Sequence, residues 1–455
     1  MIGAEKFMKN RINVKRLPKD PGPAAWNRIL PSSAGYPTLK DDIHADWVVV
    51  GGGFAGLAAA RRLSQLVGDE SIVVLEASRL ADGPAGRNSG FMIDLPHELN
   101  SDTYAGSQHQ DQQQIRLNRA AIEFARETAE AYGMERQVFD PCGKMTAAGT
   151  AKGLAHINSY RGHLDALGEA YELKSAADMK DWTGSDFYQQ GLFTPGAVMI
   201  QPAAFVRQAA RGMSERVSFY ENSPVTSMQF GAEHRLITPG GSVRAKRVIL
   251  AVNGHIQSFG FFPSRLLHVF TYASMTRALT PQEISRLGGV ADWGVLPADP
   301  MGTTVRRSSD YRGSGNRIVI RNHATLNQSI EVSPKNMKRA AGLQDRSFAN
   351  RFPMLDGVEM EYRWGGRLCL SLNSMPAFGE IEERVWSACC QNGLGTVKGT
   401  LSGMMAAEMA VLGRSDLLTD YLDHQQPKRL PPEPFLSLGA NATMRWKEWM
   451  AGTEL

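Results

Sequence analysis

Three glycines with the spacing of a phosphate-binding turn are the residues most able to do chemistry. Gly51, Gly53 and Gly56 form a G-x-G-x-x-G pattern after the apolar run 47–50 and before an Ala-rich helical segment. Such a turn lets backbone approach a diphosphate, and the N-terminus of the following helix favours an anion. Glu76 ends the next apolar run, where an acceptor for ribose hydroxyls is expected. Together, the glycine turn and Glu76 predict a bound dinucleotide. The negative charge of Glu76 disfavours a 2′-phosphate on its ribose, so NADP is not expected.

A second glycine-rich segment lies just beyond Glu76. Its sequence is Gly83-Pro-Ala-Gly-Arg-Asn-Ser-Gly90. The loop could offer backbone N–H groups to the edge of a flavin ring, while Arg87 or Asn88 meets phosphate or ring carbonyls. Alone, this segment fits an ordinary surface turn better. Because it follows the G-x-G-x-x-G fingerprint at 51–56, we interpret it as part of the same site.

A third segment opens the Ala- and Met-rich helix predicted at 397–412. Gly393 and Gly395 would let backbone come close to a planar ligand. The helix N-terminus would then place partial positive charge beside the ring and stabilise a reduced, negatively charged flavin. Simple close packing of the helix is the alternative, and Gly399 and Gly403 favour such packing.

A chain of 455 residues is too long for a single hydrophobic core, so we expect two intertwined domains to position these residues. We expect an extended arm at 1–44, a helix at 115–132, and a buried strand at 247–253. Short strands are expected between 134 and 200, and strands alternating with loops over 262–365. The tail at 426–455 should wrap the surface. No second glycine fingerprint follows another strand, so a separate NAD(P)H domain is not expected.

Bulk composition excludes several classes of protein. The sequence is 42% hydrophobic and 21% charged with a net charge of +4, so no concentrated basic stripe indicates nucleic acid. The four cysteines have no metal-ligand spacing and are too few for a disulfide scaffold. The N-terminal residues lack the apolar segment of a signal peptide, and no run of apolar residues is long enough to span a membrane. These features predict a cytoplasmic protein without a metal site. A monomer and a homodimer both stay open, because the sequence does not disclose the oligomeric state.

In order and spacing, the motifs resemble those of the D-amino-acid oxidase (DAO) superfamily of FAD-dependent oxidoreductases. The gamma-glutamylputrescine oxidase-like branch is the most similar. The resemblance covers roughly residues 40–415. The segments that carry it are Val48 to Gly56, Gly86-Arg-Asn-Ser-Gly90, Val248-Ile-Leu-Ala-Val-Asn-Gly254, Trp364-Gly-Gly-Arg367, Met375-Pro-Ala-Phe-Gly379 and Gly393-Leu-Gly395.

The resemblance implies an α/β fold: a Rossmann-like FAD-binding domain and an α+β substrate domain built on a mixed or antiparallel sheet, as in glutathione reductase and DAO. It places the FAD-binding domain at 45–135, 201–261 and 366–425. The substrate-binding domain would take 136–200 and 262–365. The arm at 1–44 and the tail at 426–455 lie outside both.

Fingerprint and resemblance together assign a set of residues to non-covalent FAD. They are Gly51, Gly53, Phe54, Ala55, Gly56, Glu76, Ala77, Gly86, Arg87, Asn88, Ser89, Gly90, Val225, Ala251, Asn253, Gly254, Gly393, Leu394, Gly395 and Thr396. Two positions depart from the family pattern. Ala85 replaces a frequent Ser or Thr, and Leu394 replaces a frequent His, which puts the substrate and the reactivity with dioxygen in question.

The chemistry that the resemblance implies is oxidation of a C–N bond in a small amine or amino acid. The substrate gives hydride to the flavin, and the imine is hydrolysed in water. His268 could serve as a base and Tyr272 could line the pocket, although a satisfied core histidine is the commoner case. Arg306 is the preferred carboxylate clamp.

Several other residues have both a functional and a structural interpretation. Arg307 and Arg321 could also clamp a carboxylate, and Trp364 could cover the flavin or belong to the core. Cys369 and His97 are weak candidates for covalent flavin attachment, because a buried cysteine usually acts as a small hydrophobic residue.

Three alternatives to an oxidase reoxidised by dioxygen stay open. A dehydrogenase would pass electrons to another carrier, and the sequence does not separate it from an oxidase. A catalytically silent flavoprotein that binds a partner is the second, and Leu394 is its best support. A tRNA-modifying flavoprotein is the third, and the modest net charge counts against it.

Overall fold

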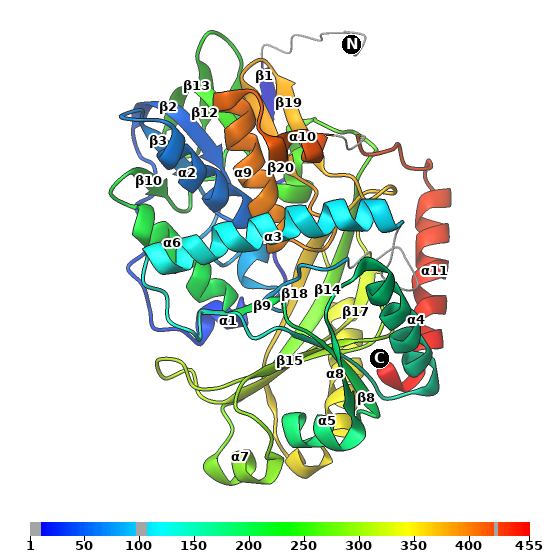
Figure 1. Ribbon diagram of the computed structural model, residues 1–455. Helices are drawn as coiled ribbons and strands as arrows, with labels where there is room; N and C mark the ends of the chain where they lie inside the picture. Colours follow the sequence, from blue (N-terminus) through cyan, green and yellow to red (C-terminus); the bar gives the residue numbers. More distant parts are fainter. Residues whose placement is uncertain (1–10, 97–106, 423–425) are drawn as a thin grey trace.

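The computed structural model describes residues 11–96, 107–422 and 426–455. Two large sheets form its frame (Figure 1). The first carries the fingerprint and is nine-stranded. Its strands are β1 (Arg11–Asn13), β2 (Asp42–Val50), β3 (Ile72–Leu75), β10 (Val217–Tyr220), β11 (Ser227–Gln229), β12 (His234–Ile237), β13 (Ser242–Leu250), β19 (Ala377–Glu382) and β20 (Val385–Cys389).

Strand β2 lies at the centre of the parallel part of this sheet, between β3 and β13. Val48 and Val49 are fully buried, because each face of the strand is covered. Parallel strands end at the same edge, so the turn after β2 and Glu76 after β3 lie side by side. The pairing of β2 with β3 therefore brings the two parts of the fingerprint, the glycine turn and Glu76, to one place.

Two helices pack closely on the face of this sheet. They are α2 (Phe54–Leu66) and α9 (Val397–Leu412). A Cβ built on Gly403 would lie 1.9 Å from the Ala55 carbonyl oxygen, and one on Gly399 would lie 3.4 Å from Phe54 Cβ. The predicted close packing at these two glycines is therefore confirmed. It brings the N-termini of both helices to the same end of the sheet.

The second sheet has eight strands in the order β18-β14-β17-β16-β15-β6-β8-β7. All neighbours are antiparallel except β15 and β6. The strands are β6 (Lys144–Ala148), β7 (Glu172–Ser175), β8 (Gln190–Thr194), β14 (Leu267–Thr276), β15 (Trp293–Pro297), β16 (Thr304–Ser308), β17 (Arg317–Leu326) and β18 (Met360–Leu370). Strand β18 crosses the predicted domain boundary at 365/366.

The remaining elements connect or cover these sheets. A small third sheet joins β4 (Phe91–Met92), β9 (Val198–Ile200) and β5 (Phe139–Asp140). The other helices are α1 (Ala25–Arg28), α3 (Gln108–Ala131), α4 (Ala151–Leu167), α5 (Ala176–Thr183), α6 (Pro202–Met213), α7 (Pro281–Leu287), α8 (Pro334–Arg351), α10 (Asp416–Leu422) and α11 (Phe435–Ala451). Figure 1 shows α3 crossing the molecule beside α9, and α11 along one edge.

Three sequence predictions about elements were incomplete. The segment 1–44 is more than an extended arm, because residues 11–13 pair with β11 and Trp26 is fully buried. Helices α4, α5 and α8 occupy stretches in which we expected strands and loops. The tail forms the 17-residue helix α11, whose packing against the second sheet includes a bond between Glu448 and His323.

Candidate functional site

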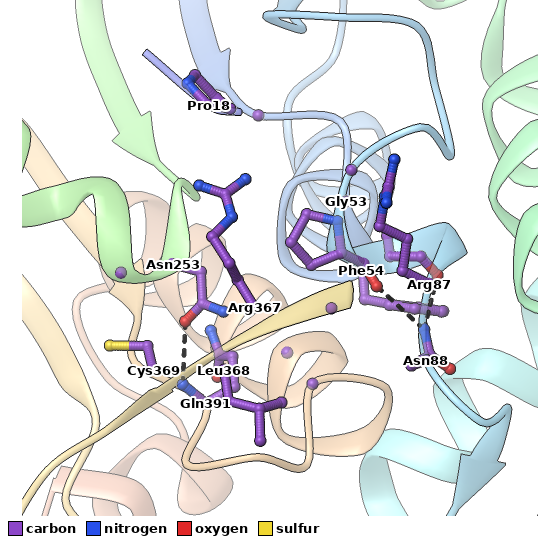
Figure 2. Close-up of a pocket in the computed structure, with 18 of the residues that line it drawn as sticks. Pro18, Gly53, Phe54, Arg87, Asn88, Asn253, Arg367, Leu368, Cys369 and Gln391 are labelled. Carbon is purple, nitrogen blue, oxygen red and sulfur yellow. Dashed lines mark hydrogen bonds between the residues drawn. The ribbon is translucent and has the colours of Figure 1, made fainter. Parts of the chain in front are cut away.

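A cavity lies between the two sheets, and Figure 2 shows part of its lining. Its first wall is the edge where β2 and β3 end, together with the loop 83–90 and the start of α9. Its second wall is formed by β14, β17 and β18. The segment 14–20 of the N-terminal arm also lines it. The cavity thus joins parts of the chain that are hundreds of residues apart.

The turn after β2 is built for close approach of a ligand to backbone. Gly51 has φ +105°, and a Cβ there would lie 2.6 Å from the Ala251 carbonyl oxygen. A Cβ on Gly56 would lie 1.7 Å from the Gly51 carbonyl oxygen, so Gly56 fixes the helix against the turn. Gly53 is the N-cap of α2, and the helix has no side-chain cap. The unpaired N–H groups of α2 are therefore available to a diphosphate.

Glu76 lies beside this turn at the end of β3. Its carboxylate accepts a bond from the Gly52 N–H at 2.8 Å and from the Ser78 N–H at 3.0 Å. A carboxylate has about four lone-pair sites, so it can also accept ribose hydroxyls. Burial raises the pKa of Glu76 from its ordinary value.

The loop 83–90 is held by buried donors on its outer side. The Trp26 indole N–H donates to the Asn88 carbonyl at 2.9 Å, and the Trp364 indole N–H donates to the Arg87 carbonyl at 3.0 Å. Arg306 donates to the next carbonyl, that of Ser89, at 3.2 Å. Three consecutive carbonyls are thus tied to three distant elements. Trp364 belongs to the core and does not cover the cavity.

Arg87 and Asn88 serve this loop in a different way from the one we expected. Both line the cavity, yet the Arg87 guanidinium donates to the carbonyls of Asp82, Pro21, Gly22 and Gly365. The Asn88 side chain accepts from the Gly90 N–H and donates to the Ala85 carbonyl. These side chains shape the loop, and the ligand is left to backbone groups.

The start of α9 faces the same cavity. Gly393, Leu394, Gly395 and Thr396 line it, and α9, like α2, has no side-chain cap. Gly393 has φ +84°, in the region that favours glycine. Two uncapped helix N-termini therefore open into one cavity, each offering partial positive charge to a bound ligand.

His268 and Tyr272, predicted on the substrate side, both line the cavity from β14. His268 Nε2 lies 2.7 Å from Gln257 Oε1, and the Tyr272 hydroxyl lies 2.6 Å from Thr325 Oγ1. Burial, with the nearby positive charge of Arg367, lowers the pKa of His268 to about 4. A histidine with this pKa is neutral at physiological pH and is a weak proton acceptor.

The predicted carboxylate clamp Arg306 lies outside this cavity, which corrects our expectation. Its side chain is buried over the Trp26 ring at 4.8 Å and donates to the Ser89 and Ile200 carbonyls. Arg307 is also turned away, with bonds to the Gly288 and Val290 carbonyls. Of the three predicted arginines, only Arg321 lines the cavity.

Arg367 is the cavity arginine that sequence reasoning did not assign, although it ends the motif Trp364-Gly-Gly-Arg367. Its Nε and Nη2 donate to the two carboxylate oxygens of Asp20, at 3.0 and 3.1 Å. Its Nη1 is buried and has no hydrogen-bond partner among the described residues. Figure 2 shows the side chain rising from its strand beside Asn253.

His255 was also missed, and it lines the cavity close to Arg367 and His268. Neither of its ring nitrogens has a partner within the part of the chain that the structure describes. Burial, reinforced by the charge of Arg367, lowers the pKa of His255 to about 2. A lone histidine five residues after the buried strand β13 gives no signal in the sequence.

Most residues predicted for FAD are brought together here. Those that line the cavity are Gly51, Gly53, Phe54, Ala55, Glu76, Ala77, Arg87, Asn88, Ser89, Gly90, Val225, Ala251, Asn253, Gly254, Gly393, Leu394, Gly395 and Thr396. Gly56 and Gly86 do not line it. A Cβ on Gly86 would lie 1.9 Å from the Ala81 carbonyl oxygen, so both glycines allow the backbone to fold tightly behind the site.

Cysteine chemistry has little support at this site. The four cysteines are free, and Cys369 is buried in the cavity wall. A hydrogen bond with Cys390 and burial hold the pKa of the Cys369 thiol well above its ordinary value, whereas a thiolate is the reactive form. His97 lies outside the described residues. Within the described ranges, no group of three His, Cys, Asp or Glu side chains could hold a metal.

Comparison with known proteins identifies relatives over most of the chain. Residues 46–409 match the family model "DAO: FAD dependent oxidoreductase". The chain is 27% identical over 392 residues to gamma-glutamylputrescine oxidoreductase of Escherichia coli, covering 85% of this chain and 87% of that protein. A solved glycine oxidase from Geobacillus kaustophilus has a TM-score of 0.67 at 17% identity, over 86% of this chain and 100% of that one.

A second solved structure has the same fold. L-amino acid deaminase from Proteus myxofaciens, in complex with anthranilate, has a TM-score of 0.65 at 15% identity. The similarity covers 89% of this chain and 97% of that one. Both structures show that the two-sheet frame is the fold of known flavoenzymes, as the sequence predicted.

Proposed function

The chain belongs to the DAO family of FAD-dependent oxidoreductases, and on this premise we propose that it oxidises the C–N bond of a small amine or amino acid. The observation that carries the proposal is the cavity into which both α2 and α9 open without side-chain caps. Its opposite wall is a sheet that presents Tyr272, Arg321 and Arg367. One wall can hold FAD, and the other can hold a substrate against it.

The residues on the first wall fit non-covalent FAD. The N-terminus of α2 would hold the diphosphate, and Glu76 the adenosine ribose. The anchored loop 83–90 and the start of α9 would hold the flavin ring, where the helix dipole stabilises negative charge. When bound, FAD supplies the chemistry of the reaction by accepting a hydride from the carbon that carries the nitrogen.

Arg367 and Arg321 are the residues that we propose for a substrate carboxylate. Asp20 fixes the Arg367 guanidinium through two bonds and leaves Nη1 without a partner among the described residues. A buried N–H group without a hydrogen-bond partner costs about 1–3 kcal/mol, so this donor favours a ligand that can accept its hydrogen bond. The relative that acts on gamma-glutamylputrescine, by its name, also supports a substrate that carries both an amine and a carboxylate.

His268 is better suited to orienting the substrate than to removing its proton. With a pKa of about 4, it is a much weaker base than an ordinary amine with a pKa near 10. The substrate amine would therefore lose its proton to water before it binds in the cavity. His268 then contributes a neutral, fixed imidazole to the pocket wall.

The proposal also covers the cellular location of the reaction and its electron acceptor. We place the reaction in the cytoplasm, which the four free cysteines favour. The substrate is a small molecule, the enzyme acts as a monomer or homodimer, and dioxygen reoxidises the cofactor. Leu394 stands near the ring where the family often has a histidine. An electron acceptor other than dioxygen is therefore the second candidate.

The test is a visible spectrum of the purified protein, recorded without oxygen during a screen of amines and amino acids. We expect bound FAD and bleaching near 450 nm by one class of substrate. Admission of air should restore the spectrum and release peroxide if dioxygen is the acceptor. Bleaching without peroxide, with turnover of a redox dye, would identify a dehydrogenase. Photoreducible flavin that no amine bleaches would overturn the proposed activity and favour a silent flavoprotein.

A further inference from the structure

The outer face of the C-terminal helix α11 carries the most exposed large apolar side chains of the described structure. Phe435, Leu438, Trp446 and Trp449 have exposed fractions of 70%, 66%, 58% and 76%, and Met450 has 40%. At about 100° per residue, these positions fall within about a third of the helix circumference. Figure 1 shows α11 along one edge of the molecule. We call this set the α11 stripe.

The stripe is exposed because the opposite face of α11 is firmly attached. Leu436, Glu448 and Ala451 are buried against the protein. The Glu448 carboxylate bonds to His323 on β17 and lies 3.1 Å from an Arg339 nitrogen on α8. The helix therefore cannot rotate to hide the stripe without breaking the contacts of the buried Glu448 carboxylate.

The net exposed charge of residues 426–451 is positive, because their exposed charged side chains are three cations and one carboxylate. Arg445 on α11 is exposed, as are Lys428 and Arg429 in the segment that leads into the helix. Two of the three acidic side chains nearby, Glu448 and Glu454, are buried, and Glu433 is exposed. Glu433 accepts two bonds from Ser437, Glu448 is paired, and Glu454 accepts the N–H groups of Gly149 and Thr150.

From this arrangement we propose that the α11 stripe binds an anionic lipid surface. A helix with aromatic and aliphatic residues on one face and flanking cations lies in the membrane interface, with its apolar face among the upper acyl chains. Tryptophan favours this depth because its ring is apolar and its N–H is polar. None of the described helices is long and apolar enough to cross a bilayer, so the attachment would be peripheral.

A second copy of the chain fits the stripe less well. A symmetric contact would bring Arg445 of two subunits onto one apolar ridge, and the three exposed cations of residues 426–451 face only one exposed carboxylate, Glu433. Anionic headgroups would neutralise Arg445 and the two cations before the helix, each by about 1 kcal/mol near the surface. Charge complementarity therefore selects the lipid surface.

Membrane attachment at this place would be close to the proposed substrate wall. His323, which Glu448 holds, stacks on the Tyr272 ring with centroids 5.5 Å apart. Tyr272 lines the cavity. The buried face of the lipid-binding helix is thus two side chains away from the site, while the stripe itself takes no part in it.

The experiment uses the full-length holoenzyme with vesicles of phosphatidylcholine and phosphatidylglycerol, and with vesicles of pure phosphatidylcholine. We expect co-sedimentation with the anionic vesicles, reduced at least tenfold by high salt. Phosphatidylcholine with brominated acyl chains, mixed into the anionic vesicles, should quench part of the tryptophan emission of the wild-type protein. This readout needs no variant.

The variant L438Q/W446Q/W449Q should bind these vesicles at least tenfold more weakly and keep its FAD spectrum and amine oxidation. The matched control is L173Q/V290Q, which changes two partly exposed apolar residues on other elements. It should bind as the wild type does.

Three outcomes would overturn the proposal. The first is the absence of wild-type co-sedimentation and quenching. The second is equal binding by the stripe variant and its control. The third is a wild-type dimer that L438Q/W446Q/W449Q converts to a monomer, which would assign the stripe to a second copy. None of these outcomes depends on whether the enzyme oxidises amines.

Discussion

Single residues in this cavity have roles that follow from the space around them. Gly53 and Gly56 belong to the same fingerprint, but a Cβ on Gly53 would meet only Ala85 Cβ, at 3.5 Å, whereas one on Gly56 would meet backbone at 1.7 Å. Gly56 is therefore needed for folding of the turn. Gly53 is needed by the ligand that approaches the α2 N-terminus.

Gly53→Val should therefore fold and lose its cofactor. The valine side chain would occupy the space of the diphosphate without disturbing the protein around it. We expect the ratio of FAD to protein, measured from absorbance, to fall at least tenfold while the far-ultraviolet circular dichroism stays unchanged. Gly68→Val is the control, because no heavy atom lies within 4 Å of that Cβ position. A yellow Gly53→Val protein with full FAD content would refute the placement.

Arg367→Lys tests the proposed carboxylate contact. Lysine keeps the charge beside Asp20 but lacks the planar fork, so it cannot bond to Asp20 and to a substrate at once. We expect KM for a carboxylate-bearing substrate to rise about 10- to 100-fold, equivalent to about 1.4–2.8 kcal/mol, with FAD content retained. Arg363→Lys on the same strand, paired with the exposed Asp345, should leave KM unchanged. An unaltered KM in Arg367→Lys would remove Arg367 from the substrate site.

His268 makes folding stability depend on pH. Its pKa is about 4 in the folded protein and near 6.5 when unfolded, so the unfolded state binds a proton first as pH falls. Its effect is absent above pH 7. Between about 6.5 and 4 it lowers the free energy of unfolding by about 1.4 kcal/mol per pH unit.

The measurement compares urea unfolding at pH 7.5 and pH 5.0 for the wild type and His268→Asn. The variant should lose about 2 kcal/mol of the pH-dependent difference, although His255 will leave some of it in place. His109→Asn, on the exposed start of α3, is the control and should behave as the wild type does. Equal pH dependence in His268→Asn and wild type would contradict the buried, neutral state of His268.

At the scale of elements, the contact between α2 and α9 decides whether two helix N-termini can serve one ligand. The sequence shows small residues on both helices, and the structure shows why they are needed. Gly403 lies against the backbone of Ala55 in the first turns of α2. Any larger side chain would separate the helices and widen the cavity at its cofactor end.

Gly403→Leu should therefore destabilise the protein and weaken FAD binding together. The new Cβ would overlap the Ala55 carbonyl oxygen at 1.9 Å, and overpacking of this kind typically costs 1–3 kcal/mol. The control is Gly439→Leu on α11, which has no neighbour within 4 Å and should be neutral or slightly stabilising. Wild-type unfolding and FAD affinity in Gly403→Leu would show that α9 can shift without affecting the site.

At the scale of the whole molecule, FAD should act as a bridge between the sheets, because residues from both line its cavity. Reconstitution of the apoprotein at 100 times the Kd should stabilise it by about 2.7 kcal/mol. For a chain of 455 residues this corresponds to a rise in Tm of about 3 °C. Differential scanning fluorimetry with FAD measures it. FMN at equal concentration, which lacks the adenosine and one phosphate, should give a smaller rise. An identical shift with FMN would argue against the roles of Glu76 and α2.

Motifs made of residues close together in the sequence were predictable, because neighbouring residues determine the conformation of a strand, turn or helix. The turn 51–56 and Glu76 are separated by one helix and one strand, and parallel pairing of β2 with β3 brings them together. Sequence order also indicated that the loop 83–90 and residues 393–396 would lie near this turn, and residues of both line the same cavity. The bonds of the Arg87 guanidinium did not follow from sequence order, because its acceptors are backbone carbonyls of the N-terminal arm and β18.

By itself, then, the sequence determined the cofactor class, the α/β fold and most of the residues that line the first wall of the cavity, because the spacing of strand, turn and helix residues is a local property of the chain. Only the tertiary structure decided which arginine faces the cavity. Arg306 and Arg367 look alike in sequence, yet one is held by the carbonyls of Ser89 and Ile200 and the other by Asp20, 347 residues away. The direction of a buried cation depends on acceptors that long-range packing brings to it, and no local pattern encodes them.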